Sequence, residues 1–322
     1  MQIIYYFCTR FMNCFGEKWT FTSFGESHGA AIGGVLDGVP AGLHIDFEMI
    51  RAELDRRAGR KPDGDLSWSD RGFTVVSSRA LHEPDEVEWL SGVLDGVTLG
   101  TPIAFLIRNK DARPEDYEAL KHSYRVGHAD RVYEQKYGIR DYRGGGRASA
   151  RETAARVVAG CIAKQQLAQR GIAIRTSLVQ VGAETNPDKF VETISAYQKE
   201  GDSIGGIIEC RINGLPAGVG EPIFDKLQAH LAFAVMSINA CKGFEYGTGF
   251  AGVTQPGSAI NAISGGIAGG ISDGTEVVFR CVFKPTPSTP KFGVKGRHDA
   301  CVATRAVPVV EAMTALSLVQ FL

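Results

Sequence analysis

Clusters of glycine constrain the fold of this chain more than any other feature of its sequence. The 322 residues include 39 glycines, and many of these are adjacent to one another. The clusters are Gly144-Gly145-Gly146, Gly205-Gly206, Gly265-Gly266 and Gly269-Gly270. Adjacent glycines permit positive φ angles and let the backbone approach a ligand or another segment closely. Two interpretations stay open for each cluster: a tight turn in a β-rich fold, or a backbone that lies against a bound group.

The expected secondary structure mixes helices and strands without a regular βαβ alternation. The clearest helical pattern runs over 149–170, with Ser149 and Glu152 as a capping box and Gly171 beyond the end. Further helices are expected over 223–238 and from Val307 to the C-terminus. Strands are expected over 74–77, 103–107, 207–212 and 276–283. This mixture predicts one α+β domain over residues 12–322, preceded by an atypical extension over residues 1–11.

Composition excludes several classes of protein. The chain carries 36 acids and 35 bases, a net charge of −1, which argues against a general nucleic-acid or membrane-surface binder. Its seven cysteines show no CxxC pair and no zinc spacing, so we expect reduced thiols in a cytoplasmic protein. No apolar run approaches the roughly 20 residues that span a bilayer. The apolar start of the chain lacks the pattern of a signal peptide.

Positive charge is concentrated between residues 121 and 156. This segment holds nine Lys or Arg residues against four acids. Arg143, Arg147 and Arg151 flank the triple glycine and the expected helix start, where free N–H groups and the helix dipole favour an anion. Guanidinium groups match the geometry of phosphate and carboxylate. The segment predicts a pocket for several anionic groups; the alternative is a solvated face with Arg147 and Arg151 in water.

Two of the seven histidines lie in compact polar settings, His28 within S-H-G and His128 within G-H-A-D. A third, His298, lies between Arg297 and Asp299. Histidine suits proton transfer near neutral pH, although a structural hydrogen-bonding role is open for each. No metal-binding spacing and no GxSxG elbow are present, so no metal is expected. The residues alone predict a cytosolic anion-binding enzyme with histidine acid–base groups.

Eleven sequence blocks follow one another in a fixed order. The first half holds FGESHG (24–29), DGVPAG (37–42), LDRR (54–57), GHAD (127–130), YGIRDYRGGGR (137–147) and SARET (149–153). The second half holds GDSIGG (201–206), MSINA (236–240), KPT (284–286), KGRHD (295–299) and RAVP (305–308). In this order they resemble the chorismate synthase family from about Met12 to the end of the chain.

The resemblance implies a fold and a reaction. The fold is a helical layer sandwiched between antiparallel β-sheets, assembled as a homotetramer. The reaction is that of a carbon–oxygen lyase acting on a phosphate: anti-1,4-elimination of phosphate from 5-enolpyruvylshikimate 3-phosphate to give chorismate, the last common step of aromatic amino acid biosynthesis in the shikimate pathway. The cofactor is FMN in its reduced form, supplied with electrons by an external flavin reductant. The cofactor performs the difficult step, and the protein binds, orients and protonates.

The resemblance also implies roles for individual residues. His28 would donate a proton to the departing phosphate, His128 would protonate the reduced flavin, and Asp299 would assist deprotonation at flavin N5. Cofactor contacts would come from Arg147, Ala148, Ser149, Asn239, Ala240, Gly269, Lys284, Pro285, Thr286, Pro287, Ser288 and Arg297. Substrate or NADP contacts would come from Arg57, Arg60, Arg125, Ala150 and Arg151.

This sequence departs from the family at several positions. Ala148 stands where Ser is common, and Val126 and Ala300 stand where Pro is common. The loops after Ser258 and after Ser288 are shorter than usual, and both would border the flavin site. We expect interruptions of the ordered chain near Ala259–Ala262 and Pro290–Phe292, because lids that order on cofactor binding have low local stability.

Three other functions compete with this interpretation. A degenerate binding protein could keep the anion pocket without catalysis, although the presence of all three expected catalytic residues disfavours it. An enzyme with its own NADPH-dependent flavin reductase activity is disfavoured because no strand–GxGxxG–helix unit is visible. A nucleic-acid binder is disfavoured by the acidic remainder of the chain.

Overall fold

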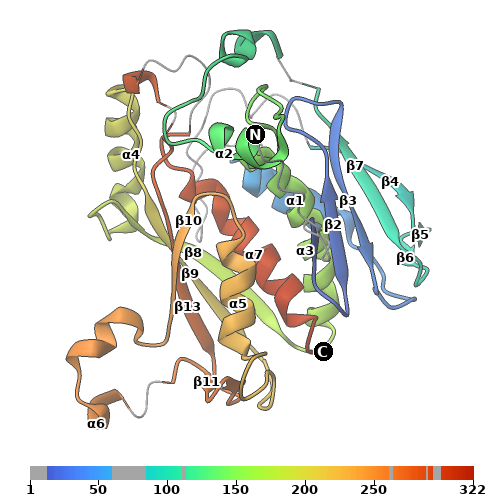
Figure 1. Cartoon of the computed structure of the whole chain (residues 1–322). Coiled ribbons are helices and arrows are strands. Elements are labelled where there is room, and N and C mark those ends of the chain that lie inside the picture. The colour runs from blue at the N-terminus through green and yellow to red at the C-terminus, as the bar shows by residue number, and fades with distance from the viewer. Residues whose placement is uncertain (1–12, 60–84, 111–113, 261–263, 288, 293–298) are drawn as a thin grey trace.

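Two antiparallel sheets enclose a layer of helices in the computed structural model, which describes residues 13–59, 85–110, 114–260, 264–287, 289–292 and 299–322 (Figure 1). The first sheet has the strand order β1-β2-β3-β7-β4. Its strands are β1 (Cys14–Phe15), β2 (Thr20–Phe24), β3 (Ala31–Asp37), β4 (Val87–Ser91) and β7 (Ile103–Arg108). In β7, Ile103, Phe105 and Ile107 are buried and alternate with more exposed residues, as expected for a sheet with one face on the core.

The second sheet has the order β10-β13-β9-β8, and each strand pairs antiparallel with its neighbour. Its strands are β8 (Ala173–Val181), β9 (Gly206–Asn213), β10 (Cys241–Tyr246) and β13 (Val277–Phe283). Two short hairpins complete the described strands, β5 (Val93–Leu94) with β6 (Val97–Thr98) and β11 (Ile267–Ala268) with β12 (Ile271–Ser272).

Four helices lie between the sheets: α1 (Phe47–Ala58), α3 (Thr153–Ala168), α5 (Leu227–Met236) and α7 (Ala303–Leu318) (Figure 1). Helix α7 is buried along most of its length. At its crossing with α3, a methyl group on Gly160 would overlap Ala312, so glycine lets the two backbones come close. Helices α2 (Asp130–Tyr137), α4 (Phe190–Lys199) and α6 (Gly257–Ile260) lie outside this layer.

One hydrophobic cluster joins both sheets to the helices between them. It includes Phe105 from the first sheet, Ile162 from α3, Val310 from α7 and Phe279 from the second sheet. The expectation of an α+β fold with helices sandwiched between antiparallel sheets is therefore confirmed.

The expected helices differ from the observed ones at their boundaries. The chain from Ser149 first makes a 3₁₀ turn, η3 (Ala150–Glu152), and α3 begins only at Thr153. The capping box is wrong, because the Ser149 hydroxyl accepts from the N–H of Arg151 and the Glu152 carboxylate pairs with Arg156. Helix α5 begins at Leu227 and is shorter than expected. Helix α7 begins four residues before Val307, with Pro308 inside it.

The expected strands over 103–107, 207–212 and 276–283 are confirmed within one residue as β7, β9 and β13. The expected interruption near Pro290–Phe292 is wrong, because these residues form the 3₁₀ turn η6. Residues 261–263 of the other short loop lie outside the described residues. The same holds for the strand over 74–77, the extension over 1–11, Arg60, Ser288 and Arg297.

Candidate active site

The triple glycine lies at the centre of the site and adopts a backbone that other residues rarely take. Gly144, Gly145 and Gly146 have φ angles of 61°, 89° and 52°. A methyl group on Gly144 would overlap His28 Nδ1, and one on Gly145 would lie 2.6 Å from His128 Cε1. The turn therefore brings the two expected catalytic histidines, 100 residues apart in sequence, against successive peptide units.

His28 is carried on the tight turn between β2 and β3. The turn is closed by a hydrogen bond from the N–H of Gly29 to the carbonyl of Glu26, 3.0 Å long. The Ser27 hydroxyl lies 3.2 Å from His28 Nδ1, and the Tyr117 ring packs edge-on at 4.7 Å between centroids. The imidazole is half-buried, so it is oriented by the protein and still reaches the surface of the site.

His128 is held by the buried residue Asp130 at the start of α2. His128 Nδ1 lies 2.8 Å from Asp130 Oδ1, and the Arg125 guanidinium donates to both carboxylate oxygens. Burial alone would raise the pKa of Asp130, but the hydrogen bonds from Arg125 and His128 outweigh it and hold that pKa well below its usual range. Because an ionised carboxylate only accepts, we assign the Nδ1 proton to this bond, which leaves Nε2 to exchange a proton.

Arg57 is deeply buried, with 2% of its surface exposed, and is the most buried of the expected substrate arginines that the structure describes. Its Nε donates to the Thr153 hydroxyl at 2.9 Å and its Nη2 to the Ala150 carbonyl at 2.7 Å, while Nη1 faces Asp85 at 3.6 Å. Burial, together with the nearby Arg305, lowers the pKa of Arg57 to about 9. The structure thus uses Arg57 to tie α1 to the start of α3.

Arg151 and Asp299 are each held by a partner in the same region. The Arg151 guanidinium pairs with Asp85 and donates from Nε to Asn109 Oδ1 at 3.0 Å. Asp299 accepts from Arg305 Nη1 at 3.0 and 3.2 Å, and Arg305 Nε donates to the Arg57 carbonyl at 3.2 Å. Arg57, Arg151 and Asp299 are therefore brought into one connected cluster.

The expected cofactor residues come together from three distant segments. Asn239 donates to the Ala148 carbonyl at 3.1 Å, and the Ala240 carbonyl accepts from the N–H of Lys284 at 3.0 Å. Ala240 has a positive φ of 67°, a strained conformation for a residue with a side chain. The neighbouring Pro287 packs on Gly127.

Several other expected cofactor residues are placed by backbone contacts. The carbonyl of Thr286 accepts from the Ser203 hydroxyl at 2.7 Å, and Pro285 packs near Gly205. Gly269 differs, because it lies in the β11–β12 turn, at the opposite end of the molecule from α2 (Figure 1).

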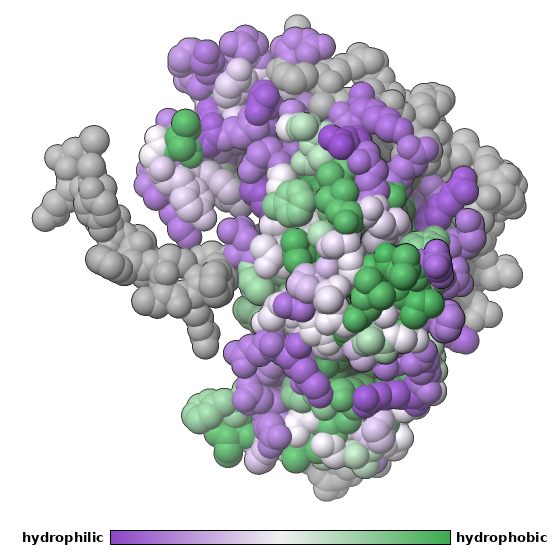
Figure 2. All heavy atoms as spheres, turned by 90° about the vertical axis from the view of Figure 1, so that its right-hand side faces the viewer, coloured by the Kyte–Doolittle hydropathy of each residue, from purple (hydrophilic) through white to green (hydrophobic). Residues whose placement is uncertain are grey.

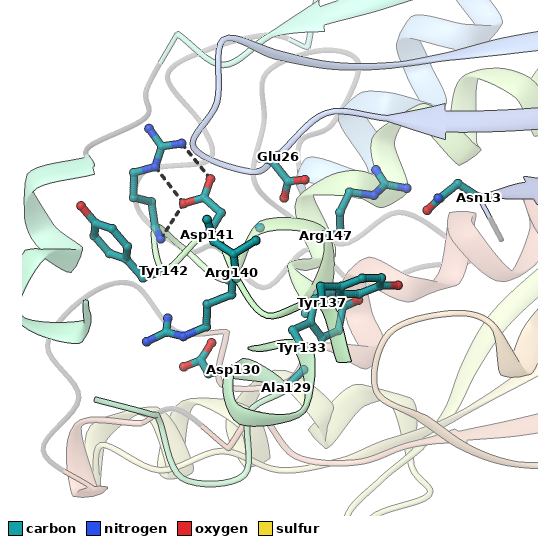
Figure 3. Close-up of a pocket in the computed structure, with 15 residues that line it drawn as sticks. Asn13, Glu26, Ala129, Asp130, Tyr133, Tyr137, Arg140, Asp141, Tyr142 and Arg147 are labelled. Atoms are coloured by element: carbon teal, nitrogen blue, oxygen red, sulfur yellow. Dashed lines mark hydrogen bonds and ion pairs between the residues drawn. The ribbon is translucent and has the colours of Figure 1, made fainter. Parts of the chain in front are cut away.

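A pocket of about 670 Å³ opens between α2 and the glycine-rich turn (Figure 3). Its wall includes Tyr133 and Tyr137 on α2, Arg147 and Ala148 after the triple glycine, and Glu26. Burial raises the pKa of Glu26, and the nearby Arg147 opposes that rise. Aromatic faces beside charged groups suit a ligand with a flat ring and polar edges.

The interpretation of Arg147 and Arg151 as side chains in water is wrong. Arg147 donates to the carbonyls of Gly25 and Ser23 and to the Ser23 hydroxyl, and Arg151 binds Asp85 and Asn109. Sequence reasoning missed Asp85 and Asn109 as parts of the site. In the sequence, Asp85 ends the segment LHEPD (81–85), which resembles a family pattern R-x-E-x-D with its arginine displaced to Arg79, and no signal identified Asn109.

Comparison with known proteins agrees with this geometry. The sequence profile described as chorismate synthase matches residues 19–322. The chain belongs to the chorismate synthase family. It is 44% identical to the chorismate synthase of Christiangramia forsetii, over 96% of this chain and 97% of that protein, and 43% identical to that of Bacteroides thetaiotaomicron, over 96% and 97%. The fold is also similar to a crystal structure of chorismate synthase, with a TM-score of 0.73 and 30% identity. The superposition covers 95% of this chain and 92% of the chain in that crystal structure.

Membership of the chorismate synthase family makes the chain a lyase of aromatic biosynthesis. Among the described residues, no group of His, Cys, Asp and Glu side chains could hold a metal ion. The described helices include none that is long and apolar enough to cross a membrane.

Proposed function

We propose that this chain converts 5-enolpyruvylshikimate 3-phosphate to chorismate by anti-1,4-elimination of phosphate, with reduced FMN bound. The observation that carries the proposal is the placement of His28 and His128 against Gly144 and Gly145, beside a cluster of arginines. Two proton-exchanging groups that lie against one glycine turn suit a reaction that releases phosphate and leaves the cofactor in its starting state.

The charge of the cluster supports an anionic substrate. Among the described residues, Arg57, Arg125, Arg151 and Arg305 pair with three carboxylates, those of Asp85, Asp130 and Asp299. Because a buried positive charge that is not fully compensated is costly, an anion that enters the cluster gains free energy by completing the balance. A substrate with two carboxylates and one phosphate fits this requirement.

The residues around Asn239 fit a flavin phosphate and ring. The buried Asn239 Oδ1 has no hydrogen-bond partner among the described residues, so it can accept a bond from a bound group. Burial, with Lys242 nearby, lowers the pKa of Lys284, and Lys284 forms no ion pair with a described residue. Its charge is therefore available for a phosphate. Reduced FMN, when bound, would supply the electron density that assists loss of phosphate without net oxidation.

The protein's own groups would then manage protons and orientation. His28 would donate its proton to the departing phosphate, and His128, fixed by Asp130 through Nδ1, would protonate the reduced flavin from Nε2. Asp299, held by Arg305, would assist deprotonation at flavin N5. The pairs that orient His128 and Asp299 reduce the cost of bringing each group into position.

The proposal extends to assembly and location: a cytoplasmic homotetramer. The first sheet and the β5–β6 hairpin beside it present apolar side chains on one outer face, where Figure 2 shows apolar residues gathered over the middle. Leu90, Leu94 and Leu99 are 59%, 61% and 50% exposed in the single chain. Because exposed apolar surface of this kind favours association, we expect other copies of the chain to cover part of it. Light scattering of the purified protein tests the tetramer.

An anaerobic assay tests the reaction. Chorismate formation would be measured with dithionite-reduced FMN, with oxidised FMN plus NADPH, and with NADPH alone. Turnover only with reduced FMN is the expected result and means that an external reductant supplies the electrons. Turnover with oxidised FMN plus NADPH would instead show an intrinsic reductase, and absence of turnover by folded protein under every condition would leave a degenerate binding protein.

A further inference from the structure

Asn109, the first residue after β7, lies between two parts of the proposed site that are far apart in sequence. On one side is the turn from Glu26 to Gly29, which carries His28. On the other side is Arg151, at the start of the α3 region. The side chain of Asn109 bonds to both, and the inference from this residue rests on the proposed function.

Every polar atom of the Asn109 amide is engaged in a defined direction. Nδ2 donates to the carbonyl of Glu26 at 2.9 Å and to that of Gly29 at 3.0 Å, while Oδ1 accepts from Arg151 Nε at 3.0 Å. A carbonyl can only accept and a guanidinium can only donate, so the orientation of the amide is fixed by its partners. The two carbonyls flank Ser27 and His28, so a single NH₂ group holds both ends of the histidine turn.

The contact of Asn109 with Arg151 connects the His28 turn to the arginine cluster. Arg151 pairs with Asp85, which also faces Arg57 at 3.6 Å. The backbone N–H of Asn109 donates to the Ala30 carbonyl at 3.1 Å, which anchors the residue beside β3. A continuous set of contacts therefore runs from the buried Arg57 through Asp85, Arg151 and Asn109 to the turn of His28.

We propose that Asn109 is a positioning residue that fixes the His28 turn relative to the anion-binding arginines. The distance between the proton donor and a bound phosphate depends on the placement of both groups. A misplacement of about 1 Å can reduce turnover on the order of 100-fold. Asn109 sets that placement without touching the reacting atoms.

The substitution Asn109→Asp keeps the contact with Arg151 and removes the contacts with the His28 turn. One oxygen of the aspartate still accepts from Arg151. The other oxygen faces the carbonyls of Glu26 and Gly29, which the NH₂ group had bound, and these acceptors repel one another. We expect kcat at saturating substrate to fall about 10- to 100-fold in protein that remains folded. In ¹⁵N spectra of the cofactor-free protein, the ring signals of His28, assigned with His28→Gln, are expected to shift. Asn186→Asp is the matched control. The Oδ1 of Asn186 accepts from the N–H of Asp188 at 3.1 Å, and an aspartate oxygen can accept the same bond.

The two readouts keep this inference distinct from the proposed function. Inactive wild-type protein would end the proposed function, while the spectra would still report on the histidine turn. A wild-type kcat in Asn109→Asp, or a reduced kcat with unshifted His28 signals, would overturn the positioning role. If Asn109→Asp does not fold, Asn109→Ala replaces it under the same criteria, since it also removes both bonds to the turn.

Discussion

Arg56 and Arg57 are neighbours on α1, yet they belong to two charged clusters with opposite character. Arg56 joins Glu53, Lys164 and Glu311 in the helical layer, where two acids face two bases. The Thr176 hydroxyl donates to Glu311 at 2.7 Å and completes that network. Arg57 joins the cluster of the active site, where the bases outnumber the acids among the residues that the structure describes. Burial by itself therefore does not separate a binding site from a structural network, whereas charge balance does.

The first way to test the comparison is to break the balanced network. In Glu311→Gln, Lys164 and Arg56 lose a buried carboxylate, and we expect the free energy of unfolding to fall by about 3–5 kcal/mol. Since the network lies in the helical layer, kcat of protein that remains folded should be unchanged. Urea unfolding gives the first quantity and the anaerobic assay the second. Glu88→Gln, in an exposed pair with Arg108, is the control and should leave stability unchanged. A large loss of kcat in folded Glu311→Gln would contradict the separation.

The second test acts on the active site alone. Gly144→Ala places a methyl group against His28, and we expect kcat to fall about 100-fold through displacement of the imidazole. Gly138→Ala is the matched control, since Gly138 also has a positive φ, 76°, but has open space around it. That control should cost only about 1 kcal/mol of stability. Equal activity of the two variants would show that contact with His28 is unimportant.

The third test compares the two arginines directly. Lysine keeps the charge but loses the planar fork, so Arg57→Lys breaks the bonds to Thr153 and Ala150. We expect kcat/KM to fall about tenfold, because Arg57 ties α1 to the start of α3 within the site. Arg56→Lys should instead lower the free energy of unfolding by about 1 kcal/mol, with kcat/KM unchanged. If Arg56→Lys lowered kcat/KM and Arg57→Lys lowered only the free energy of unfolding, our assignment of the two clusters would be wrong.

The smallest effect concerns acid pH. The pKa of Glu311 is lowered, since its bonds with Lys164 and Arg56 outweigh burial, and that of Asp130 is lowered in the same way. A carboxyl group with a lowered pKa in the folded state adds stability above its unfolded pKa and loses it as the pH falls. We expect a loss of about 1 kcal/mol between pH 7 and pH 4, measured by urea unfolding. The loss should be smaller in Glu311→Gln, and an equal loss would count against this assignment.

Local patterns were sufficient to predict much of the fold. Alternating apolar residues identified β7 and β13, and the apolar stripe after Ser149 identified α3. The start of α3 was misplaced because the Ser149 hydroxyl bonds to Arg151, a choice that depends on the turn before it. Pro308 obscured the start of α7, because its tolerance inside the helix depends on surrounding packing.

The candidate site was predictable as a set of residues but not as a set of contacts. The excess of arginine predicted an anion pocket, and the family resemblance predicted site roles for both histidines, which the structure brings against Gly144 and Gly145. No pattern could show that Asp85 lies between Arg57 and Arg151, or that Asn109 reaches the turn of His28, since these partners are 28 to 83 residues apart. Which positive charges remain uncompensated follows only from tertiary structure.

The position of Arg56 and Arg57 on α1 also limits how this helix can change in length. Successive residues on an α-helix point about 100° apart. Insertion or deletion of one residue before Arg56 would rotate both side chains, so that Arg56 would turn away from Glu311 and Arg57 away from Thr153. Helix α1 can therefore tolerate many exchanges of its amino acids, but it cannot gain or lose a single residue without disrupting the helical layer and the active site together.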